Sequence, residues 1–171
     1  MLINTLIYLR QRNRKVLCEL FSTSLFLTPC LFIFFFHLLN RLDDLNEKIQ
    51  LEKPLPMARF RPNIIFKGEN PFEEDKFKTI VIGNNKFSCV QNCARCKMTT
   101  VDQEKGEFAG EEPLKTLNTY RKQKNIVGEG SGVTFGIHLI EYASLSDEVR
   151  KIALGDQIEV LELREPQQFV D

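Results

Sequence analysis

Tryptophan is absent from the 171 residues, and neither charge sign is in excess, since 23 Lys and Arg balance 23 Asp and Glu. This balance argues against nucleic acid as the main partner, because such proteins displace phosphate counterions with surplus positive charge. Five cysteines form an odd and scattered set, which argues against a small secreted domain held by disulfides. Repeats and low-complexity tracts are also missing. The length fits one domain with an appendage.

One long apolar run is present. No charged residue occurs from Leu20 to Leu39, and six of the 14 phenylalanines lie in the first forty residues. Twenty helical residues at about 1.5 Å each reach across a bilayer core of roughly 30 Å. Basic residues precede the run, which predicts a cytoplasmic N-terminus. We therefore expect residues 1–37 to form an apolar helix that anchors the protein in a membrane. A targeting segment, or an irregular N-terminus interrupted by Pro29, are the alternatives.

Residues 38–171 have the pattern of a separate, mainly β domain. Two short helices are expected, one over residues 42–49 and one that opens at Pro113. The other apolar runs are short and bounded by turn residues, which is typical of strands. These expected strands are residues 63–66, 79–82, 87–90, 98–101, 133–140 and 158–163. Many strands and few helices predict a β-barrel.

The sharpest local motif is Cys93-Ala94-Arg95-Cys96. A structural zinc site needs four ligands, and no second pair of this kind exists in the sequence. A thioredoxin-type pair needs its first cysteine at a helix N-terminus, which the β-rich residues after Cys96 disfavour. A third possibility is one thiolate that ligates a metal whose other ligands come from an organic chelate, with Arg95 near an anionic group of that cofactor. Two ordinary buried cysteines are the remaining alternative.

A second motif is Arg59-Phe60-Arg61-Pro62-Asn63. In an extended segment, both arginines point to the same side, and guanidinium groups bind phosphate through two parallel hydrogen bonds. Solvated arginines on an edge strand are the alternative.

Several motifs in this order resemble one family. RFRPNIIF, NPFEEDKFKTIVIGNNKF, CARCKMTTVDQEKGEFAGEEPLKTLNTYR, VTFGIHLI and IALGDQIEVLEL resemble the MOSC domain, the C-terminal domain of molybdenum cofactor sulfurases. Mitochondrial amidoxime-reducing components are the relatives that these motifs resemble most, over about residues 38 to 165. The resemblance implies a MOSC-like β-barrel that binds molybdenum cofactor, and the family is also associated with pyridoxal phosphate binding.

The resemblance also implies roles for individual residues. Cys96 would be the catalytic thiolate that ligates molybdenum, and Arg61 and Asn63 would contact the cofactor. Ala94 and Arg95 would hold the cofactor through backbone and side chain. Cys93 would lie behind the ligand, and Asp75 is assigned no catalytic role.

Family members reduce N-hydroxylated compounds and take electrons from cytochrome b5 and its NADH-dependent reductase. We therefore expect these partners, a small N-hydroxylated substrate, and a location at the mitochondrial outer membrane. The family's N-terminal β-rich domain has no counterpart in residues 1–37, so we expect a cofactor site that is built only in part. Two further hypotheses are a MOSC module that carries sulfur as a cysteine persulfide and a cofactor-binding module without turnover.

Overall fold

The computed structural model describes residues 2–3, 8–9, 33–123, 132–142, 152–165 and 169–170. Its helices are α2 (Leu39–Ile49) and α3 (Leu114–Tyr120), with single 3-10 turns at η1 (Met57–Phe60), η2 (Glu73–Lys76) and η3 (Lys97–Thr100). Its strands are β1 (Leu2–Ile3), β2 (Tyr8–Leu9), β3 (Ile33–Leu38), β4 (Ile64–Phe66), β5 (Phe77–Ile82), β6 (Asn85–Ala94), β7 (Val101–Asp102), β8 (Glu107–Phe108), β9 (Lys122–Gln123), β10 (Thr134–Glu141), β11 (Ile158–Leu163) and β12 (Phe169–Val170).

Eight strands form one sheet in the order β1-β11-β5-β6-β10-β3-β4-β2. All neighbours are antiparallel except β3 and β4, which run parallel. A two-residue loop joins β5 to β6, and its first residue, Gly83, has a φ of 58°, as expected where turn residues separate two strand runs. In the described residues the end strands β1 and β2 are not paired with each other. The mainly β prediction is therefore confirmed, and the sheet is an open half-barrel.

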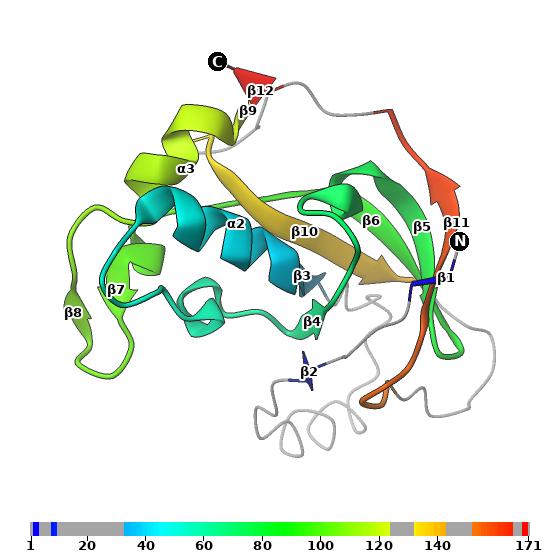
Figure 1. Cartoon of the computed structure of the whole chain (residues 1–171). Coiled ribbons are helices and arrows are strands. Elements are labelled where there is room, and N and C mark those ends of the chain that lie inside the picture. Colours follow the sequence, from blue (N-terminus) through cyan, green and yellow to red (C-terminus); the bar gives the residue numbers. More distant parts are fainter. Residues whose placement is uncertain are drawn as a thin grey trace, which may run out of the picture.

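Helices cover one part of this sheet. Figure 1 shows α2 and α3 on the same side of the molecule, near the N-terminal end of β10. Together with η1 they enclose a cluster of buried apolar residues: Leu42, Leu45, Met57, Phe60, Leu117, Val133 and Phe135. A second cluster lies among β3, β4, β5, β6, β10 and β11 and includes the stacked rings of Phe36 and Phe66, with centroids 4.1 Å apart. The two helices predicted from the sequence are confirmed as α2 and α3.

Charged groups are buried beside the helices. The Arg41 guanidinium lies 2.8 Å from Glu74 and 2.7 Å from Asp75, and Arg121 lies 2.7 Å from the other oxygen of Asp75. Both guanidinium groups lie against the ring of Phe72, at 4.6 Å for Arg41 and 4.4 Å for Arg121. These ion pairs fix α2 and the end of α3 to η2, because a buried charge left alone would cost several kcal/mol.

The membrane-anchor prediction needs correction. Its last residues, Ile33–Leu38, form β3, which pairs with β10 on one side and β4 on the other. Phe36, His37 and Leu38 are fully buried there. Among the described residues, no helix has the length and apolar character needed to cross a bilayer. A helical anchor over residues 20–39 is therefore wrong, and the mitochondrial outer membrane location is withdrawn. Residues 20–32 lie outside the described part of the chain.

The strand predicted at residues 98–101 is also wrong. Lys97–Thr100 form the 3-10 turn η3, and only Val101–Asp102 are extended, as β7. The hydroxyl of Thr99 donates to the Cys96 carbonyl at 3.0 Å, and that of Thr100 donates to the Lys97 carbonyl at 2.8 Å. These local bonds to carbonyls three residues earlier compete with strand pairing, so threonine's strand preference is overridden.

We predict that Gly136→Ala destabilises the protein strongly. Gly136 has a φ of 87°, and a Cβ there would lie 2.4 Å from Cε1 of the buried His37. Left-handed backbone costs a non-glycine residue about 1–2 kcal/mol, and the clash adds about 1–3 kcal/mol. The free energy of unfolding in urea should fall by about 2–5 kcal/mol in total. Gly106→Ala is the control, since its φ is 74° and its Cβ would meet nothing within 4 Å. Equal losses in both variants would contradict this packing.

We predict that the wild type loses more stability than Glu74→Gln as pH rises, so the cost of the substitution shrinks. Burial raises the pKa of Glu74 to about 7, although Arg41 opposes the rise. A carboxyl whose folded pKa exceeds its unfolded value loses its stabilising contribution as pH rises through the folded pKa. The wild type should therefore lose on the order of 3 kcal/mol more than the variant between about pH 4.5 and pH 8. Urea unfolding at pH 5, 6, 7 and 8 measures this, and parallel pH profiles would contradict it.

Candidate functional site

The two sequence motifs lie on neighbouring 3-10 turns. The arginine-rich motif runs from the end of η1 to the residue before β4, whereas the cysteine motif runs from the end of β6 to the residue before η3. The turns η1 and η3 pack against each other. Arg61 ends η1 with a φ of 52°, and its N–H donates to the Ala58 carbonyl at 3.1 Å. Motifs more than thirty residues apart in sequence are thus brought together.

Arg95 connects these motifs directly. Its side chain is buried, with 6% exposed, and its Nη1 donates to the Phe60 carbonyl at 3.1 Å. Its Nε donates to the Phe135 carbonyl of β10 at 2.7 Å, and its backbone N–H donates to Val133 at 2.8 Å. Burial lowers the pKa of Arg95 to about 10, so the group stays charged near neutral pH. Carbonyl oxygens compensate the charge here in place of a carboxylate.

His37 is the fourth group that Arg95 contacts. Its Nε2 lies 2.8 Å from Nη2 of Arg95. An arginine only donates hydrogen bonds, so Nε2 must be the acceptor and the proton must lie on Nδ1. Burial, followed by the charge of Arg95, holds the pKa of His37 well below its ordinary value, and the ring is neutral. His37 was not among the predicted site residues, because it belongs to the apolar run that was expected to form the anchor.

The two cysteines of the motif differ in environment. Cys96 is exposed, is not in a disulfide, and lies in extended backbone before η3, with φ −119° and ψ 179°. Cys93 is buried in β6, and burial raises the pKa of its thiol. A thioredoxin-type pair is therefore not formed, because the first cysteine lies in a strand and not at a helix N-terminus. Of the two, Cys96 offers the sulfur that a ligand can reach.

The other predicted cofactor residues surround this turn. Arg61 is exposed, while Asn63 and Ala94 are half-buried. Ala94 is the last residue of β6 and pairs with Thr134. No three His, Cys, Asp or Glu side chains among the described residues group closely enough to hold a metal ion together. The described chain thus provides no structural zinc site, and the roles predicted for Arg61, Asn63, Ala94, Arg95 and Cys96 stay predictions.

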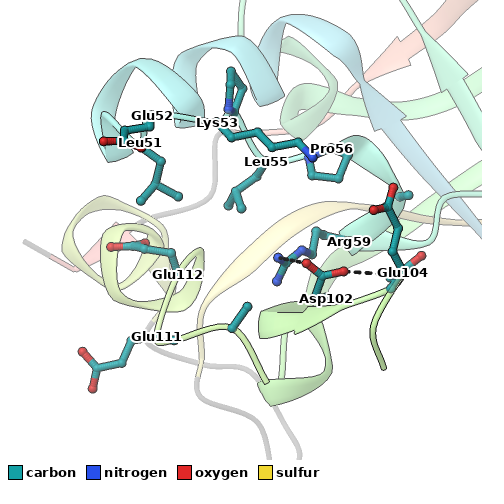
Figure 2. A pocket seen from close by; sticks show the side chains of 15 residues that line it. Leu51, Glu52, Lys53, Leu55, Pro56, Arg59, Asp102, Glu104, Glu111 and Glu112 are labelled. Atoms are coloured by element: carbon teal, nitrogen blue, oxygen red, sulfur yellow. Dashed lines mark hydrogen bonds and ion pairs between the residues drawn. The ribbon is translucent and has the colours of Figure 1, made fainter. Parts of the chain in front are cut away.

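Two neighbouring cavities flank η1 and η3. The larger one has a volume of about 700 Å³ and lies between the loop after α2 and the β7–β8 hairpin (Figure 2). Figure 2 shows Arg59 at its wall beside Asp102, 4.0 Å away. Two backbone N–H groups, of Glu104 and Lys105, lower the pKa of Asp102. The second cavity, about 590 Å³, includes Lys97, the residue after Cys96, and shares Gly110 and Glu111 with the first.

Comparison with known proteins identifies the family. The sequence model of the MOSC domain matches residues 37–159. The chain belongs to the MOSC domain family. It is 37% identical to mitochondrial amidoxime reducing component 2 of Bos taurus over 121 residues, which are 68% of this chain and 33% of that protein. It is 41% identical to mitochondrial amidoxime-reducing component 1 of Homo sapiens over 81 residues, 47% of this chain and 23% of that protein.

A second kind of MOSC protein is also similar. Molybdenum cofactor sulfurase of Oryza sativa is 31% identical over 127 residues, which are 70% of this chain and 15% of that protein. The chain thus spans a third or less of the length of these relatives. The MOSC resemblance in the sequence is confirmed, and the family match begins at residue 37, inside β3.

We predict that Arg95→Lys lowers the free energy of unfolding by about 2–4 kcal/mol, because a lysine cannot reach the carbonyls of Phe60 and Phe135 together with His37. Arg61→Lys is the matched control, since Arg61 is the exposed arginine of the other motif. It should change stability by no more than about 0.5 kcal/mol. Equal stability of the two variants in urea would contradict a structural role for Arg95.

Proposed function

We propose that this MOSC domain binds molybdenum cofactor through Cys96 and takes part in the reduction of N-hydroxylated compounds. One observation carries the proposal: the exposed thiol of Cys96 lies on a turn that packs against the turn ending in Arg61. We also propose that the half-barrel is the described part of a MOSC-type barrel.

The residues present fit such a cofactor. A single accessible thiolate is a soft ligand that suits a metal held otherwise by an organic chelate. Arg61 is an exposed guanidinium that can pair with a phosphate group, and Asn63 beside it offers an amide. Arg95 does not offer its guanidinium outward in this structure, since Phe60, Phe135 and His37 contact it inside the domain.

These positions give the cofactor and the surrounding residues different roles. When bound, molybdenum supplies two-electron chemistry between its +6 and +4 states. Cys96 would hold the metal, and Arg61 and Asn63 would orient the cofactor. Arg95 would keep the turns that carry Cys96 and Arg61 at a fixed separation. The cavity that includes Lys97 gives a small substrate room beside this turn.

The reduction of an N-hydroxylated compound to an amine or amidine consumes two electrons and two protons and releases water. An electron donor is therefore required, and we propose cytochrome b5 with its NADH-dependent reductase. Support for this comes from the similarity to amidoxime reducing components, of which the chain covers a third or less.

A sulfur-carrying module is the second candidate. The similarity to a molybdenum cofactor sulfurase covers 70% of this chain. In that case Cys96 would carry a persulfide, because its sulfur is exposed and that of Cys93 is buried.

We predict near-stoichiometric molybdenum in the full chain purified from a host that makes the cofactor, and nearly none in Cys96→Ser. Cys93→Ser is the matched control, because it removes a thiol from the same motif that is buried, and it should keep most of the metal. Elemental analysis per chain, on protein whose folding is checked by circular dichroism, measures both.

The two hypotheses give different results. Metal that disappears only in Cys96→Ser, together with turnover of an N-hydroxylated amidine by the wild type, supports the reductase. A persulfide on Cys96 in the mass spectrum, without turnover, supports the sulfur carrier. A folded wild-type chain with neither metal nor persulfide would contradict both.

A further inference from the structure

The segment before Cys96 is fixed by one side chain with several partners. Arg95 immediately precedes Cys96, and its guanidinium group contacts two carbonyls and one ring nitrogen. The carbonyls belong to backbone that the sheet and η1 hold in place. The ring nitrogen belongs to His37, which lies 58 residues away in sequence.

We propose that His37 is a positioning residue for Cys96, which it orients through Arg95. The proposal rests on the proposed function only in taking Cys96 as the residue that reacts or binds metal. Nη2 of Arg95 donates both to the Phe135 carbonyl and to Nε2 of His37, so this side-chain acceptor helps to set the orientation of the guanidinium plane together with the backbone carbonyls. The same plane donates to Phe60, so the end of η1 that carries Arg61 is set with it.

The histidine ring is itself held tightly. It packs against the stacked rings of Phe60 and Phe135, whose centroids are 3.9 Å apart and lie 6.2 and 5.5 Å from that of His37. Gly136 allows this approach, because a Cβ there would lie 2.6 Å from Nδ1 of the ring. An acceptor packed this tightly supports one orientation of Arg95 together with the Phe60 and Phe135 carbonyls, whereas a mobile acceptor would not.

The position of His37 makes the orientation of Arg95 depend on how β3 pairs in the sheet. His37 lies in β3, the strand between β10 and β4, and it is the first residue of the family match. Correct pairing of β3 is therefore needed to place Nε2 of His37 within hydrogen-bond distance of Arg95. The apolar run that ends in β3 contributes to the site in this way.

The test compares three variants of the full chain by the rate at which iodoacetamide alkylates Cys96, followed by peptide mass spectrometry. His37→Leu removes the acceptor and should change the rate by roughly three- to tenfold, as expected when the bonds of one buried charged group rearrange. His37→Gln keeps an acceptor and should restore the rate to within about twofold of wild type. His138→Leu is the control, because His138 lies in β10 and faces Gln91 at 3.3 Å.

Equal rates in His37→Leu and His37→Gln, whether changed or unchanged, would overturn the proposal. Since His37→Leu could unfold the domain, a measurement on the wild type gives an independent test. The ¹⁵N chemical shifts of His37 should show a proton on Nδ1 and none on Nε2. A proton on Nε2 would exclude the hydrogen bond and overturn the proposal. The positioning role and the proposed function can fail separately. If the variants show the expected alkylation rates but the wild type binds no molybdenum, the positioning role is supported and the proposed function is contradicted.

Discussion

A buried guanidinium group with carbonyl partners is the contact on which the candidate site depends. Arg95 reaches from the cysteine motif to the Phe60 carbonyl of the arginine motif and to the Phe135 carbonyl of β10. A buried charge needs nearly all its donors satisfied, so the surrounding backbone has little freedom. The geometry of the exposed Cys96 follows from this constraint.

Buried arginine recurs elsewhere in the domain with other partners. Arg41 and Arg121 are compensated by Glu74 and Asp75, and both lie against the ring of Phe72. The contact of Arg41 with Glu74 lies within ion-pair distance but lacks hydrogen-bond geometry. Burial therefore raises the pKa of Glu74 despite the nearby charge. The domain thus holds its helices by ion pairs and its candidate site by charge-to-carbonyl bonds.

Local pattern predicted the helices and most strands. Leu42 and Leu45 in α2 recur at helical spacing, as do Leu114 and Leu117 in α3, and the strand runs are bounded by turn residues. It failed where a local interaction competed, as with the Thr99 hydroxyl, and where length misled, as with Ile33–Leu38. An uncharged run reads alike whether lipid or a sheet surrounds it. The sequence motifs identified Arg95 and Cys96 as candidate site residues. They could not show that Arg95 faces inward, or that His37 lies beside it, since both depend on strand pairing far away in the sequence.

A double-mutant cycle between His37 and Arg95 tests the central claim most directly. The free energy of unfolding would be measured for the wild type, His37→Leu, Arg95→Met and the double variant. Residues that share a buried hydrogen bond should show a coupling of about 1–3 kcal/mol, since the second substitution removes a bond already lost. Losses that add within about 0.5 kcal/mol would contradict the account, because the two side chains would then act independently.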